Sequence, residues 1–203
     1  MDKQKGILQT KILYCDHITN TDRDVDDISR FSVRHPEVAE GLERYLKEQA
    51  LSDESENLMR TYLVRDIETN ELVGYFSLKS GMVSINEREI INESGEVEVT
   101  FDTIPGIEIA NYAVNDLYVK AHSDWKGLGV INIRDFIREL ALQSASISGA
   151  RLLYIFALPF KSLIKRYHTS YHFLRLDDLE EDDLHKRLKP FYDRSCIFMY
   201  QLL

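Results

Sequence analysis

The sequence has few cysteines, no long hydrophobic run and no metal-like spacing of ligands. Its only two cysteines, Cys15 and Cys196, lie far apart, so neither a disulfide framework nor a zinc site is predicted, and we interpret both as small buried hydrophobic residues. No stretch approaches the roughly 20 apolar residues of a membrane span. Residues 1–10 are charged and contain no apolar run of signal-peptide length. We therefore expect a cytoplasmic protein that binds neither a membrane nor a metal.

Positive charge and linker residues are also scarce. The 203 residues contain 34 acidic and 25 basic side chains, for a formal net charge of -9. The chain therefore has no overall positive field, which disfavours a nucleic-acid partner. With four prolines and nine glycines, the chain has no Pro/Gly-rich linker, and it has no internal repeat. We expect one domain over residues 1–203, with 44% hydrophobic residues to form a single core.

Hydrophobic periodicity predicts an alternation of strands and helices typical of an α/β domain. The expected order is a strand at 7–14, two helices ending near 35 and 49, a hairpin at 60–80, a strand at 107–114, a long helix at 126–149, a buried strand at 152–158, a helix after 159 and a strand at 196–203. Residues 82–106 are acidic and interpreted as an insertion and candidate lid. Residues 177–183 are expected to form an acidic connection.

The segment with the clearest chemical signal is a strand followed by the loop Lys126-Gly127-Leu128-Gly129, which opens directly into the long helix. Glycines let the backbone turn tightly, so that successive N–H groups and the positive end of the helix dipole can face a pyrophosphate. Lys126 would add positive charge. The loop lacks the Lys-Ser/Thr ending of a P-loop and the third glycine of a dinucleotide fingerprint, so ATP and NAD sites are poorly supported. Another phosphate-bearing ligand is required.

Three segments resemble the signature of the GNAT family of N-acetyltransferases. Glu108-Ile109-Ala110-Asn111-Tyr112-Ala113-Val114 is similar to the family's Glu-Ile-x-x-x-Ala-Val strand, and Asp124-Trp125-Lys126-Gly127-Leu128-Gly129 to its Gln/Arg-x-x-Gly-x-Gly/Ala loop. Tyr167-His168-Thr169-Ser170-Tyr171-His172-Phe173 is similar to its later Phe-Tyr-x-x-x-Gly-Phe segment. The resemblance covers residues 60–203 and the element order before them.

The resemblance implies an α/β acyl-CoA N-acyltransferase fold, whose mostly antiparallel central sheet is splayed between its fourth and fifth strands and flanked by helices. It implies acetyl-CoA as the acyl donor and a primary amine of a small molecule or protein as the acceptor, with direct transfer. Exposed edge strands could pair two copies into a homodimer. The residues that the resemblance assigns to the coenzyme are Tyr112, Ala113, Val114, Asn115, Asp124, Trp125, Lys126, Gly127, Leu128, Gly129 and Val130.

The catalytic candidates each have two interpretations. Glu108 lies where several family members carry a general base, but it could equally be an ordinary strand or salt-bridge carboxylate. Tyr167 and His168 compete as proton donor to the leaving thiolate, although the apolar stripe Leu163, Ile164 and Tyr167 also fits a core role for Tyr167. They cannot point the same way on a helix.

Three departures from the family pattern keep a second function open. Asp124 replaces Gln or Arg, and His168 and His172 replace the usual Tyr and Gly. The connection after Val114 is about five residues longer than usual, which permits an alternative register with Val119 at the strand end. A catalytically silent acyl-CoA-binding regulatory module is therefore the alternative to an acetyltransferase.

Overall fold

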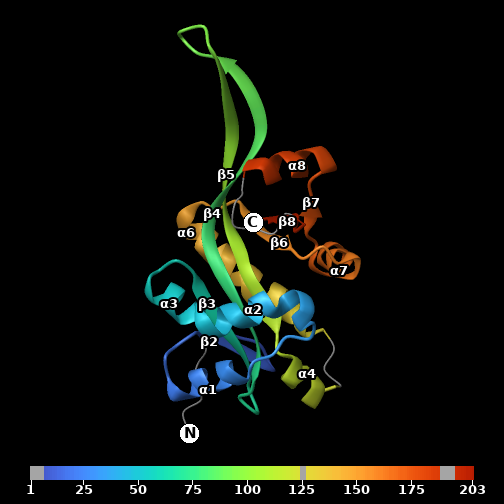
Figure 1. Cartoon of the computed structure of the whole chain (residues 1–203). Coiled ribbons are helices and arrows are strands. Elements are labelled where there is room, and N and C mark those ends of the chain that lie inside the picture. Colours follow the sequence, from blue (N-terminus) through green and yellow to red (C-terminus); the bar gives the residue numbers. More distant parts are fainter. Residues whose placement is uncertain (1–6, 124–126, 188–194) are drawn as a thin grey trace. The chain divides into compact units, whose positions relative to one another are not determined.

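A computed structural model describes residues 7–123, 127–187 and 195–203 of the chain (Figure 1). The chain forms two compact units, and two long strands contribute to both. Unit 1 contains residues 1–79 and 109–140, and unit 2 contains residues 80–108 and 141–203. Among the described residues, no helix is long and apolar enough to cross a membrane.

Unit 1 begins with short antiparallel strands. β1 (Leu8–Gln9) pairs with β2 (Leu13–His17), which pairs with β3 (Arg60–Asp66), and β3 pairs with the first part of β4 (Leu72–Ile91). The prediction of one strand over residues 7–14 is wrong, because the chain turns after Gln9. The Thr10 hydroxyl accepts a hydrogen bond from the Leu13 amide at 2.9 Å and stabilises this turn.

Three helices follow β2, although the sequence pattern predicts two. They are α1 (Asp22–Arg30), α2 (Pro36–Glu48) and α3 (Ala50–Ser55). Their apolar side chains form a core with those of β3 and β4, in which Phe31, Leu46, Leu63 and Tyr75 are at most 1% exposed. Burial of these side chains from water is the main stabilising contribution of this layer.

The second half of unit 1 continues from β5 (Val97–Val114) into α4 (Asp116–Ala121), then into α5 (Leu128–Ile131) and the π-helix η1 (Asn132–Ile137). η1 leads into α6 (Arg138–Ser148), so the long helix predicted near 126–149 is confirmed. The sequence pattern did not predict its π-helical middle. Helix α4 was not predicted either.

Unit 2 is built around β6 (Leu152–Ala157), the buried strand that its apolar run predicted. β6 pairs in parallel with β5 and antiparallel with β8 (Ile197–Leu202), the predicted closing strand, which also pairs with β7 (Leu174–Arg175). The β5–β6 ladder joins residues 106–108 to residues 152–154 and comprises only these three pairs, although each strand continues.

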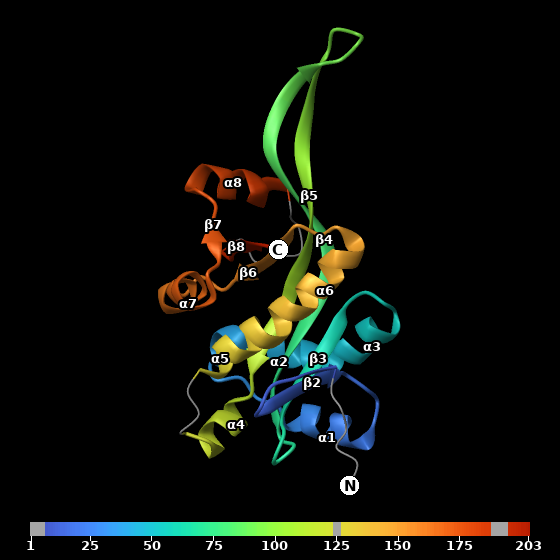
Figure 2. The same cartoon turned by 180° about the vertical axis from the view of Figure 1, so that it is seen from behind.

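Two helices flank these strands. α7 (Lys161–Tyr171) confirms the helix expected after Pro159, and it lies on the opposite side of β6 and β8 from α8 (Asp178–Arg187) in both views (Figures 1 and 2). The prediction of an acidic connection at 177–183 is wrong. The Asp177 carboxylate accepts from the Glu180 amide at 2.8 Å, while the Glu180 carboxylate accepts from the Asp177 amide at 3.3 Å. This reciprocal capping starts α8.

The segment expected as an insertion, residues 82–106, forms the distal parts of β4 and β5, which turn back at Asn92–Gly95. Near α8, Val83 and Ile104 pack in a core cluster with Leu184. Beyond this point the two strands extend past α8 (Figure 1).

The end of α7 contains a residue in an unfavourable backbone conformation. His172 has a φ of 60°, the left-handed region in which glycine lacks the steric penalty of other residues. His172→Gly is therefore expected to raise the free energy of unfolding by about 0.5–1 kcal/mol, which thermal denaturation would record as a Tm increase of roughly 1–4 °C. Thr169→Gly, inside α7, should instead lower stability by about 0.3 kcal/mol. A His172→Gly protein that melts below the wild type would contradict this interpretation.

Candidate functional site

The strand end assigned to the coenzyme lies in unit 1, where Tyr112 and Val114 are half-buried and Ala113 is buried. β4 approaches this strand closely at Gly74, where an added Cβ would lie 2.7 Å from the Ala113 carbonyl oxygen. Glycine at position 74 thus permits the approach that fixes the end of β5. The sequence signal for this residue was an isolated glycine inside a predicted strand.

Asn115 has a different role from the residues before it. Its amide donates to the Val73 carbonyl at 2.8 Å, and its carbonyl accepts from the Val119 amide at 3.1 Å. Its side chain caps α4 by accepting from the Leu117 amide, and it donates to the Leu72 carbonyl at 2.9 Å. Asn115 therefore connects the end of β5 to β4 and α4.

Helix α4 accounts for the long connection after Val114. The chain forms a helix over Asp116–Ala121 before it reaches the glycine loop. Val119 lies inside this helix, so the alternative register with Val119 at the strand end is wrong.

The start of α5 has the geometry expected of an anion cradle. Gly127 has a φ of 89°, which only glycine adopts readily, and nothing lies within 4 Å of the position that a Cβ would occupy. The Gly127 carbonyl accepts from the amides of Val130 and Ile131. Leu128 and Gly129 come first in the helix, where amides have no partner within it. The predictions for Asp124, Trp125 and Lys126 lie outside the described residues.

Asn132 is a polar residue in the same helix that sequence reasoning missed. Its side chain is 0% exposed, and neither its amide nitrogen nor its oxygen has a hydrogen-bond partner in the described part of the chain. A buried amide without partners costs about 1–3 kcal/mol, and π-helical turns often occur at functional sites. The backbone at Gly127 is open, whereas the Asn132 amide is enclosed by the protein.

The three catalytic candidates lie in unit 2, whereas the described coenzyme candidates lie in unit 1. Glu108 is 4% exposed, and its carboxylate accepts a hydrogen bond from the Tyr154 hydroxyl at 3.4 Å. Burial and the charge of Glu108 raise the pKa of Tyr154 above its usual value. Tyr154 therefore stays protonated at neutral pH and remains a donor to Glu108.

Two glycines make room for the Tyr154 ring. A Cβ at Gly81 would lie 2.2 Å from the Tyr154 hydroxyl, and a Cβ at Gly106 would lie 3.0 Å from the Tyr154 ring. The aromatic rings of Phe156 and Phe198 pack against Tyr154 with centroids 6.2 and 5.7 Å away. The Tyr154 hydroxyl is thus held beside Glu108. Sequence reasoning did not identify this pair, because it joins strands that are distant along the chain.

Tyr167 and His168 point in different directions, as their adjacent helical positions require. Tyr167 is 3% exposed and contacts Tyr171 and Phe173 edge-on, with ring centroids 5.3 and 5.4 Å away. Burial raises the pKa of Tyr167. His168 is exposed, and its Nδ1 lies 3.0 Å from the Phe173 carbonyl oxygen. Tyr167 therefore belongs to the core, and His168 faces solvent.

No protein-family model matches the chain, and no curated protein sequence matches it. Solved structures of bacterial toxins do match. A tyrosine-to-phenylalanine mutant of KacT has a TM-score of 0.59 and 14% identity, covering 95% of each chain. AtaT complexed with acetyl-methionyl-tRNAfMet has a TM-score of 0.58 and 13% identity, covering 94% of each chain. AtaTR bound with AcCoA has a TM-score of 0.58 and 13% identity, covering 95% of each chain.

At these identities the likeness concerns the fold. The matched toxins have a GNAT fold, and they align over nearly the whole length of both chains. The combination of antiparallel strand pairs with a short parallel β5–β6 ladder is consistent with this assignment. The chain therefore has the GNAT-like α/β fold that its sequence motifs predicted.

Proposed function

We propose that the chain is an acetyl-CoA-dependent N-acetyltransferase that moves an acetyl group directly to a primary amine. The observation that carries this proposal is the left-handed turn at Gly127, which opens the start of α5 after the strand end at Val114. The fold supports it, because AtaTR, which shares the fold, is bound with AcCoA in one of the matched structures.

In this proposal the coenzyme's pyrophosphate accepts hydrogen bonds from the amides of Leu128 and Gly129, and the helix dipole stabilises its charge. Asp124, Trp125 and Lys126 stay predictions of the sequence for the same loop. The pantetheine arm pairs with backbone groups of Tyr112, Ala113 and Val114. Asn115 contributes indirectly, because its hydrogen bonds hold the strand end to β4.

The coenzyme supplies an activated acetyl thioester, and the protein positions the acceptor and moves protons. Glu108 accepts a proton from the ammonium group of the acceptor, directly or through a water molecule, and the neutral amine then attacks the thioester. Tyr154 orients the Glu108 carboxylate. His168 is a better candidate than Tyr167 for the residue that donates a proton to the leaving thiolate, because the Tyr167 hydroxyl belongs to a buried aromatic cluster.

The acceptor amine is expected on a small molecule or a protein. The AtaT complex contains an acetylated aminoacyl-tRNA, so an acceptor panel should contain small amines, peptides with free N-termini and aminoacyl-tRNA. A protein that binds the coenzyme but releases no coenzyme A thiol with any of them would be the silent acyl-CoA-binding module.

Calorimetric titration with acetyl-CoA tests the coenzyme site. We expect micromolar binding to the wild type and its loss in a Gly127→Glu, Gly129→Glu double variant, because the new carboxylates oppose phosphate and Gly127 needs a positive φ. Gly41→Glu, an exposed glycine in α2 with open space around it, is the matched control. No binding to the wild type would contradict the proposed function.

A further inference from the structure

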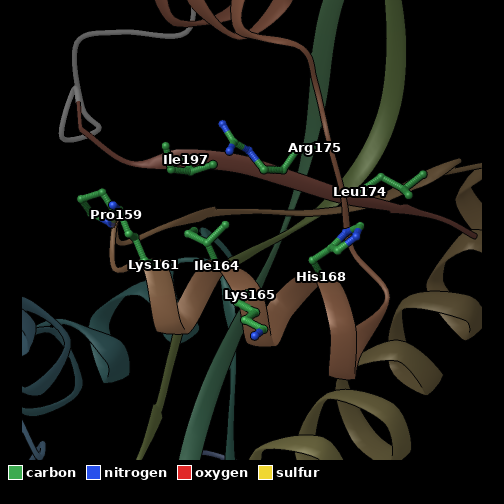
Figure 3. Close-up of a pocket in the computed structure, with 8 residues that line it drawn as sticks. All are labelled: Pro159, Lys161, Ile164, Lys165, His168, Leu174, Arg175 and Ile197. Carbon is green, nitrogen blue, oxygen red and sulfur yellow. The ribbon is translucent and has the colours of Figure 1, made fainter.

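Unit 2 contains a cavity of about 620 Å³ between α7 and the strands β7 and β8 (Figure 3). Its volume lies in the range of sites for small molecules, about 300–1,000 Å³. Half of the lining residues are basic or histidine and half are apolar. They are Lys161, Lys165, His168 and Arg175, with Pro159, Ile164, Leu174 and Ile197.

The cavity lies in the least acidic part of the sequence. Although the chain has a net charge of -9, residues 140–176 contain no Asp or Glu. Among the described residues, neither Lys161 nor Lys165 has an acidic partner within ion-pair distance, whereas the Arg175 guanidinium pairs with the Glu181 carboxylate at 2.9 Å. Two lysines thus line the cavity without a described counter-charge, which favours an anionic ligand.

Helix α7 brings these groups to one face. Lys161, Lys165 and His168 are spaced by four and three residues, so they lie on the same side of the helix. The His168 Nδ1 donates to the Phe173 carbonyl at 3.0 Å when it carries the proton, which leaves Nε2 for a ligand. The aliphatic side chains of Leu174 and Ile197 line the cavity from the strands (Figure 3).

We propose that this cavity binds the phosphate and base of a nucleotide unit. The negatively charged phosphate matches the positive charges of Lys161 and Lys165, and the flat base packs on the aliphatic side chains of Ile164, Leu174 and Ile197. A ligand with only a carboxylate would pair with the lysine charges but leave the apolar side chains of the cavity without a contact. A free nucleotide and the end of an RNA strand share this chemistry. The inference goes beyond acetyl transfer, because it assigns to the cavity a ligand other than the coenzyme. The described coenzyme cradle belongs to unit 1, whereas His168, the proposed proton donor, also lines the cavity.

Calorimetry with the full chain at about 50 mM salt tests this site, because ionic contacts are strongest at low ionic strength. The probes are AMP, a single-stranded octamer of riboadenosine, and adenosine without phosphate. We expect AMP or the octamer to bind at least about tenfold more tightly than adenosine, and raising the salt to about 200 mM to weaken that binding. Tighter binding of AMP identifies a free nucleotide as the ligand, and tighter binding of the octamer identifies an RNA end.

A Lys161→Met, Lys165→Met double variant keeps the aliphatic stems and removes both charges. It should weaken the preferred probe at least about tenfold and leave thermal stability unchanged, because exposed charges without partners contribute little to folding. Lys186→Met is the matched control, since Lys186 pairs with Asp183 at 2.8 Å outside the cavity.

Two results would overturn the proposal. The first is equal affinity of the wild type and the double variant for AMP and the octamer, including no measurable binding to either. The second is displacement of the probe by acetyl-CoA together with loss of acetyl-CoA affinity in the double variant, which would assign the cavity to the coenzyme's own nucleotide. Failure of the proposed acetyltransferase would instead appear as no acetyl-CoA binding to the wild type.

Discussion

Replacing Glu108 by Gln is expected to slow acetyl transfer about 100-fold or more, the usual contribution of a positioned general base. The introduced amide keeps the shape of the carboxylate, and its oxygen still accepts a hydrogen bond from Tyr154, so the fold and the acetyl-CoA affinity should stay close to those of the wild type. Release of the coenzyme A thiol, measured with the acceptor found in the panel, gives the rate. Calorimetry gives the affinity.

The pH profile separates a base from a structural carboxylate. If Glu108 removes the proton, kcat/KM of the wild type rises with pH through one ionisation, and this rise is lost in Glu108→Gln. Tyr154→Phe keeps the carboxylate and removes the donor that orients it, so this variant should retain the rise at a lower rate. An unchanged rate in Glu108→Gln would show that Glu108 is structural, whatever the coenzyme affinity.

Gly81→Ala is expected to destabilise the protein by about 1–3 kcal/mol, the usual cost of inserting a methyl group into a packed interior. The new Cβ would lie 2.2 Å from the Tyr154 hydroxyl, while the next Tyr154 atom would be 3.4 Å away. The ring cannot easily retreat, because Phe156, Phe198 and the backbone at Gly106 surround it. Thermal denaturation should record a Tm lower by roughly 2–10 °C.

A double-mutant cycle makes this prediction specific. Tyr154→Phe removes the clashing oxygen, so Gly81→Ala should cost less than about 0.5 kcal/mol in that background, a coupling of at least about 0.5 kcal/mol. Gly41→Ala, in an exposed part of α2 with nothing within 4 Å, should be neutral or stabilising. Equal destabilisation by Gly81→Ala in both backgrounds would mean that the cost arises from the backbone and not from Tyr154.

Local patterns in the sequence are sufficient to predict much of the fold. The apolar run at Leu152–Ala157, the stripe of α7 and the glycine turn at Gly127 each depend on residues that are neighbours in the chain, and the structure confirms all three. Helix caps are harder to predict from the sequence. The acidic composition of residues 177–183 predicts a loop, yet Asp177 and Glu180 cap a helix whose Leu184 is buried in unit 2.

The sequence by itself determined the alternation of strands and helices, the GNAT-like motifs and the glycine turn at Gly127, since periodicity and glycine conformation are local properties. Only the tertiary structure decided which side chains meet. It placed Tyr154 against Glu108 through space left by Gly81 and Gly106, buried Tyr167 while exposing His168, and left the Asn132 amide buried without a partner among the described residues. These outcomes depend on strand register and on the face that each helix presents to its neighbours. Both are set by contacts between residues that lie far apart in the chain.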